Sequence, residues 1–153
     1  MSSLSDLYNE LKTDVVALAD PLFEHSQKRL QARDDFLPHG AVLDAEGKVV
    51  LLGAMTGSKE GQANAAQIMS MLHKGIRQMS REKVLVAVGI AEHVSLTRGE
   101  VPMQAIKVLL EHERRLNVAM FLPYHKADSG EYHYGEAFVR PAHPALDLWP
   151  EIP

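Results

Sequence analysis

The chain has 153 residues, a length typical of one domain, and it contains no cysteine, so disulfides, thiolate-bound metals and a cysteine nucleophile are excluded. Its formal charge is -4, with 20 acidic against 16 basic residues, whereas nucleic-acid-binding domains usually carry a basic face. The polar start, MSSLSDLYNELK, lacks the segments of a signal peptide, and no apolar run approaches the roughly 20 residues that span a bilayer. We therefore expect a cytoplasmic protein that binds neither nucleic acid nor membranes.

The first predicted element is an amphipathic helix over residues 4–19. Apolar residues three and four apart form one stripe along it: Leu4, Leu7, Leu11, Val15, Leu18 and Leu22. Pro21 interrupts this pattern, because proline lacks the backbone N–H of a helical hydrogen bond and clashes with the preceding turn. Either the helix kinks at Pro21, or a second helix begins there with Asp20 as its N-cap.

The segment 36–52 (FLPHGAVLDAEGKVVLL) predicts a hairpin on which the rest of the sheet is built. Two short strands, 41–43 and 48–52, flank a turn at 44–47, where Asp44 tolerates turn conformations and Gly47 supplies positive φ. His39, at the start of this hairpin, is interpreted as a loop or edge residue. The sequence thus predicts an antiparallel pair immediately after the first helix.

A glycine-containing segment, 53–59 (GAMTGSK), follows the hairpin. A phosphate-binding loop has the order GxxxxGK[ST], but here Ser58 precedes Lys59, and Gly53 and Gly57 are one residue too close. We interpret the segment as a loop in which Ser58 caps the helix predicted over 60–80. The apolar face of that helix contains Ala65, Ile68, Met69, Leu72, Ile76 and Met79.

The next strand, predicted over 83–96, is apolar on both faces. Alternation places Val84, Val86, Val88 and Ile90 on one face and Leu85, Ala87, Gly89 and Ala91 on the other. A strand of this kind is covered on both sides. The small residues favour close packing of a helix, and the β-branched face requires another helix or a partner subunit.

Two further hairpins are expected after a loop at 97–103. Strands 104–112 and 116–122 keep their apolar faces together only in the register Leu110–Val118, Val108–Met120, Ile106–Leu122, which requires an odd loop, of three residues near Arg114 and Arg115. A turn at 124–130 leads to the last strand, 131–139. The proline-rich tail, 140–153, carries Leu148 and Trp149, which we expect to dock on the body or on a neighbour.

Histidines provide the candidate chemistry. If the last hairpin closes at the Asp128 turn, His125 and His133 lie opposite each other, within reach of one metal ion, and Asp128, Glu131 or His143 would be the third ligand. Zinc needs three or four ligands and only two are placed, so we interpret the pair as exposed histidines and predict no cofactor. In the run 111–113 (EHE), alternation puts His112 on the face opposite both glutamates, so no local triad forms.

The order helix, two strands, helix, three strands is similar to that of the roadblock and longin group and, more loosely, of profilin. The segments PHGAVLDAEGKV, AIKVLLEHE, VAMFLPYHK and YHYGEAF also resemble a family of small, uncharacterised bacterial proteins. In that family an aromatic-Pro-x-Gly-Ala motif at the start of the hairpin and a Tyr-Gly-Glu motif recur, here at 36–41 and 134–136. The roadblock resemblance implies a dimerising or partner-binding scaffold; the bacterial family implies no established activity.

We therefore predict an α+β domain over 1–139, with an antiparallel sheet of about five strands and two main helices, followed by the tail 140–153. The leading functional hypothesis is a non-enzymatic interaction or scaffold module that forms a homodimer, with Leu148 and Trp149 as partner-binding residues. The alternative is a small-molecule- or metal-binding protein, or an enzyme, with its site near His125 and His133.

Overall fold

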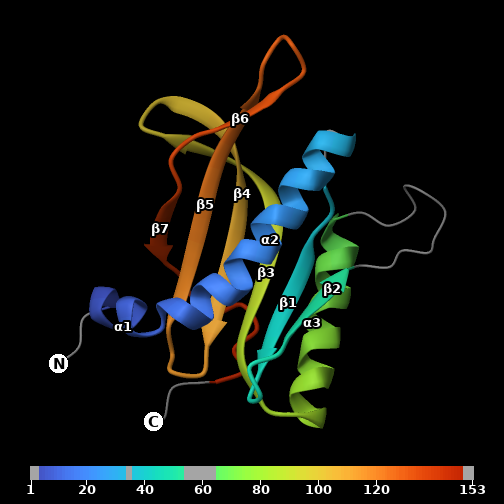
Figure 1. Ribbon diagram of the computed structural model, residues 1–153, viewed down its shortest axis with the longest axis vertical. Coiled ribbons are helices and arrows are strands. Elements are labelled where there is room, and N and C mark those ends of the chain that lie inside the picture. The colour runs from blue at the N-terminus through green and yellow to red at the C-terminus, as the bar shows by residue number, and fades with distance from the viewer. Residues whose placement is uncertain (1–3, 34–35, 54–64, 150–153) are drawn as a thin grey trace.

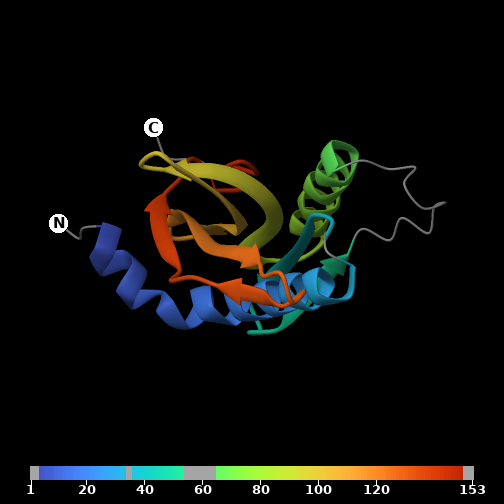
Figure 2. The ribbon, with the colours of Figure 1, turned by 90° about the horizontal axis from the view of Figure 1, so that it is seen from above.

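The computed structural model describes residues 4–33, 36–53 and 65–149. These residues form three helices and one seven-stranded antiparallel sheet: α1 (Leu4–Glu10), α2 (Lys12–Arg33), β1 (His39–Asp44), β2 (Val49–Gly53), α3 (Ala65–Glu82), β3 (Leu85–Arg98), β4 (Val101–His112), β5 (Asn117–Lys126), β6 (Tyr132–Tyr134) and β7 (Phe138–Pro141). The strand order is β2-β1-β3-β4-β5-β6, and β7 also pairs with β5. The sheet is strongly curled, with α2 on one face and α3 on the other (Figures 1 and 2).

The predicted α+β class is confirmed, but the predicted counts of about five strands and two helices are wrong. One reason is that the strand expected over 131–139 divides into β6 and β7. At the break, the Gly135 N–H donates to the Pro123 carbonyl, 2.9 Å away, and the chain resumes pairing with β5 at Phe138. None of the described helices is long and apolar enough to cross a membrane.

The first helix is interrupted at Leu11 and continues through Pro21. The alternative in which a second helix starts at Asp20 is therefore wrong. A proline inside a helix costs about 3 kcal/mol. Leu18 and Leu22, both fully buried beside it, contribute about 1.5–3 kcal/mol each. Tertiary packing is therefore sufficient to hold α2 helical across the proline.

Strand β3 is covered on both faces by this chain, as its composition predicts. Ala87 and Ala91 belong to the core beneath α2, and Val88 and Ile90 belong to the core beneath α3. The small face permits close approach, since a Cβ added at Gly89 would lie 2.8 Å from a methyl carbon of Leu22. The strand therefore needs no partner subunit to bury it.

The predicted alternation along β3 is wrong at its start. The register with β1 shifts between Leu43, which pairs with Ala87, and Asp44, which pairs with Leu85. The extra residue in β3, Val86, therefore packs with the α2-side core instead of sharing the face of Val88. The predicted strand start is also too early, because Val84 precedes β3 and is 66% exposed.

The β4–β5 register is confirmed pair for pair, and its loop has the predicted three residues, closed by Arg115 at φ 63°. The loop expected over 97–103 is shorter than predicted. Strands β3 and β4 remain paired up to Arg98 and Val101, because Gly99 adopts a φ of 68° and a two-residue turn suffices. The region 53–59, Ser58 and the first residues of the predicted helix 60–80 fall mostly outside the described residues, apart from Gly53 at the end of β2.

The tail crosses the α3 side of the sheet, where Leu148 and Trp149 are half-buried against the core, so the expected docking on the body is confirmed. Leu146, which the sequence did not single out, is more deeply buried. The tail is held by Glu111, whose Oε2 accepts hydrogen bonds from the N–H groups of Ala145 and Leu146 and whose Oε1 accepts one from Asp147, each 2.9 Å long. Glu111 is 2% exposed, so on folding its carboxylate loses hydrogen bonds to water and accepts three from backbone N–H groups instead.

Candidate functional site

A row of polar aromatic residues crosses the α2 side of the sheet near the C-terminal end of α2. Strand pairing explains the row, because directly opposed residues share a face. His39 pairs with Ala91, which is two residues before His93 and on the same face. His93 pairs with Ile106, two residues after Gln104, and Gln104 pairs with Tyr124. The side chains of all four residues therefore point to the face that carries α2. Beyond the end of that helix, the Phe36 ring contacts the rings of His39 and His93, and a pocket lies further along the row, beside Tyr124.

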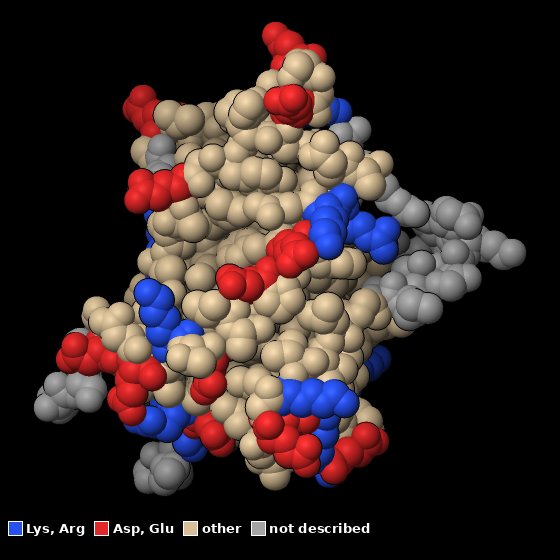
Figure 3. Space-filling model, in the orientation of Figure 1, with Lys and Arg blue, Asp and Glu red and all other residues tan. Residues whose placement is uncertain are grey.

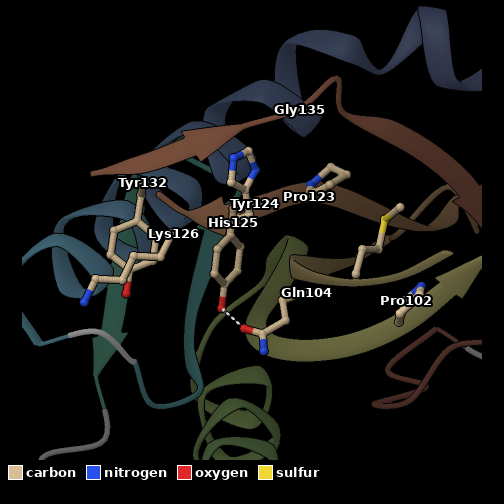
Figure 4. Close-up of a pocket in the computed structure, with 9 residues that line it drawn as sticks. Pro102, Gln104, Pro123, Tyr124, His125, Lys126, Tyr132 and Gly135 are labelled. Carbon is tan, nitrogen blue, oxygen red and sulfur yellow. Dashed lines mark hydrogen bonds between the residues drawn. The ribbon is translucent and has the colours of Figure 1, made fainter. Parts of the chain in front are cut away.

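Tyr124 is the fixed centre of the row. Its hydroxyl donates to Gln104 Oε1 over 3.1 Å (Figure 4). Nε2 of His93 lies 3.1 Å from the same oxygen, which accepts from both. The Tyr124 ring lies 5.8 Å from the ring centroids of His93 and Tyr132. These spacings are typical of favourable edge and tilted aromatic contacts. Tyr124 is buried, so the ring is held in place by packing as well as by its hydrogen bond.

A cavity of about 710 Å³ lies against this centre, beneath the β5–β6 hairpin. Pockets for small molecules usually have volumes of about 300–1,000 Å³. Lys126 is the only charged residue among its described lining residues, and its Nζ lies 5.8 Å from the centroid of the Tyr132 ring. The lining comprises Pro102, Met103, Gln104, Pro123, Tyr124, His125, Lys126, Tyr132 and Gly135 (Figure 4). The cavity therefore lies beside aromatic, amide and ammonium groups, whereas the imidazole of His125 points to the side of β5 opposite the Tyr124 ring (Figure 4).

His39 lies at the other end of the row and is buried, so its interpretation as a loop or edge residue is wrong. Strand β1 is enclosed between β2 and β3, which places this side chain under α2. Burial lowers the pKa of His39, and the hydrogen bond between its Nδ1 and the Leu37 carbonyl, 2.9 Å long, opposes that shift. The ring of His25 lies 4.4 Å away, and its own pKa is lowered by burial and by His39.

Ser26 and His39 resemble the nucleophile and base of a hydrolase on distance alone. Ser26 Oγ lies 3.2 Å from His39 Nε2 and also 2.9 Å from the Leu22 carbonyl. However, Ser26 is 0% exposed, so no substrate reaches its hydroxyl. We interpret the pair as a buried polar contact between α2 and β1.

The predicted histidine pair is confirmed in position, since His125 pairs with His133 across β5 and β6 and their ring centroids are 5.4 Å apart. Within the described ranges, no group of three His, Asp or Glu side chains could hold a metal ion. Among the described residues, the two histidines therefore come together without a third ligand. His125 is among the residues that border the cavity, and a site near His125 and His133 stays a prediction.

The run 111–113 forms no local triad, as predicted. His112 Nε2 contacts Asp14 Oδ2 of α2 at 2.8 Å, and its Nδ1 accepts a hydrogen bond from the Arg114 N–H. Glu111 points to the other side and binds the tail. Leu148 and Trp149 also lie on that α3 side, away from the cavity.

The sequence analysis missed the contact of Tyr124 with Gln104 and His93. One signal for it was available: extending the predicted β4–β5 register by two residues pairs Gln104 with Tyr124. The contact of His93 with Gln104 depends on the β3–β4 register. The predicted loop over 97–103 was too long to fix that register.

Acidic and basic side chains are interspersed on the face of the molecule that carries α2, without a continuous basic stripe (Figure 3). In comparison with known proteins, the chain matches no protein-family model, no curated protein and no solved structure.

Proposed function

We propose that this protein binds a small molecule in the cavity beneath the β5–β6 hairpin. The observation that carries the proposal is the cavity of about 710 Å³ built against Tyr124, whose ring is fixed by Gln104 and by its aromatic neighbours. A wall that is already ordered loses little conformational freedom when a ligand binds. The site thus has both the volume and the rigidity that favour binding.

The chemistry of the lining favours a ligand with a flat apolar body and an anionic group. Tyr124 and Tyr132 offer surfaces for stacking, and an aromatic contact contributes about 0.5–1.5 kcal/mol beyond its buried area. Lys126 supplies a positive charge at the rim, and none of the described lining residues is acidic. These groups provide stacking, hydrogen bonding and charge attraction, so the proposal concerns binding and includes no chemical step.

Ligand-observed NMR with four matched probes tests this proposal: benzoate, phenylphosphonate, benzamide and benzylamine. We expect saturation transfer to benzoate and phenylphosphonate, weaker transfer to benzamide and none to benzylamine, because Lys126 attracts anions and repels cations. Tyr132→Ala should abolish transfer to both anions, and Lys126→Gln should reduce it.

Lys48→Gln is the matched control, since Lys48 is exposed beside the first hairpin and does not line the cavity. Binding of no probe, or binding that both cavity variants leave intact, would overturn the proposal. Preference for benzylamine would retain a binding site but reject the anionic ligand.

A homodimeric interaction module is the second candidate function, in a cytoplasmic setting that the cysteine-free composition favours. Two sequence features suggested a dimer, and both are explained within one chain: α3 covers the second face of β3, and Leu148 and Trp149 pack on the same core. Dimerisation is favoured instead by the position of β2 at the end of the described strand order.

A further inference from the structure

The two edges of the sheet are built differently. On one side, β5 is followed by two short strands, β6 with three residues and β7 with four, and β7 contains the exposed residues Arg140 and Pro141. Short edge strands, charges and prolines are the usual means by which proteins prevent pairing with another chain. This edge is therefore protected.

The other edge is β2, whose sequence, Val-Val-Leu-Leu-Gly, has no charge and no proline. Among the described strands only β1 pairs with it. Alternate residues of a strand in an antiparallel pair direct their N–H and C=O groups away from the neighbour, so β2 presents a row of backbone groups outward. Leu51, in the middle of the strand, is 55% exposed. Within the described part of the chain, backbone and side chain together leave an apolar edge available for pairing.

From this contrast between the two edges, we propose that β2 pairs with β2 of a second copy of the chain. A strand edge is completed by another strand, and a second copy is the partner certain to bring an apolar, charge-free edge of the same length. An antiparallel pair centred on Leu51 is symmetric, as a two-fold dimer requires. It joins the two sheets into one and places the two Leu51 side chains next to each other.

The flanks of β2 are compatible with this arrangement. Val50 and Leu52 already pack towards α3, and Val49 packs with the α2-side core. These residues keep their contacts in a dimer, and Leu51 gains an apolar neighbour. The β2 edge lies beyond β1 and away from the β5–β6 hairpin, so dimerisation leaves the cavity open (Figures 1 and 2).

Sedimentation velocity and native mass spectrometry at micromolar concentration test the assembly. We expect a dimer for the wild type and a weakening of association of more than about tenfold for Leu51→Lys, since like charges directly opposite each other repel. Val101→Lys is the matched control: Val101 is 61% exposed at the turn between β3 and β4, and it should leave the dimer intact. Circular dichroism checks that both variants fold.

The absence of native cysteine permits a second test of the same contact. Leu51→Cys should form a disulfide-linked dimer under mild oxidation, because directly opposed residues have Cβ atoms about 4.5–5.5 Å apart. Val101→Cys should not. A monomeric wild type, a dimer that Leu51→Lys leaves unchanged, or equal cross-linking of both cysteine variants would each overturn the proposal.

Discussion

Replacing Glu111 by Gln should loosen the C-terminal tail. The change keeps the size of the side chain but converts one acceptor oxygen into an NH₂ group, which cannot accept a hydrogen bond. The carboxylate is 2% exposed and accepts three backbone N–H groups, so at least one buried donor loses its partner in Glu111→Gln. That loss costs about 1–3 kcal/mol.

The two remaining bonds also change from charged to neutral, which costs about 1 kcal/mol each. The sum, about 3–5 kcal/mol, is a large share of the 5–15 kcal/mol by which domains are usually stable. Burial of Leu146 contributes roughly 1.5–3 kcal/mol to holding the tail, and the half-buried Leu148 and Trp149 add to it, so the three hydrogen bonds are a comparable share of what holds the tail. We therefore expect the tail to detach before the rest of the domain unfolds.

Trp149 makes this detachment measurable. It is the single tryptophan of the chain and lies half-buried beside Leu148 on the α3-side core. In Glu111→Gln its emission should shift to the red in the absence of denaturant, and the urea midpoint should fall. Glu113→Gln is the control, because Glu113 lies two residues further along and the described tail residues donate their hydrogen bonds to Glu111 instead. Unchanged emission and an unchanged midpoint in Glu111→Gln would refute the role of the carboxylate.

Two further predictions concern Gly89 and His39, which both lie under α2, and the first uses Gly75 of α3 as its comparison. Gly89→Ala should destabilise the domain by about 1–3 kcal/mol in urea unfolding, because the new methyl group would lie 2.8 Å from Leu22. Gly75→Ala, which meets no atom within 4 Å in the middle of α3, should instead stabilise it by about 0.5–1 kcal/mol; equal effects of the two variants would contradict the packing argument. Because burial holds the pKa of His39 below its ordinary 6.5, the unfolded chain binds the proton more readily, so stability should be full above pH 6.5 and fall as the pH drops below it. His39→Gln should make that loss shallower in urea midpoints measured across the range, and an unchanged slope would show that this ring does not contribute.

The cavity was only partly predictable from the sequence. The facing of His125 and His133 follows from a short turn and strict alternation, both of which are local. The centre of the site is not local, since Tyr124 and Gln104 meet His93 only after three strands have assembled in register. The lysine at the rim gave no signal in the sequence, because an exposed lysine on a strand is ordinary.

By itself, the sequence determined the elements that depend on near neighbours. Alternation of apolar residues defined the β4–β5 register, Asp44 and Gly47 defined the first turn, and the two apolar faces of β3 required two covering layers. Each of these follows from side-chain period or backbone conformation within a few residues.

The tertiary structure alone decided what depends on segments far apart in the chain. Pro21 stays within α2 because buried leucines on both sides of it compensate for the lost hydrogen bond. Val86 lies on the α2 side of the sheet, not on the side of Val88, because β3 has one residue more than β1 between the pairs Leu43–Ala87 and Asp44–Leu85. Glu111 looks like a solvent-facing residue in its strand, and it becomes a buried anchor only because the tail brings three N–H groups to it. In all three cases the deciding energy comes from contacts that the local sequence does not contain.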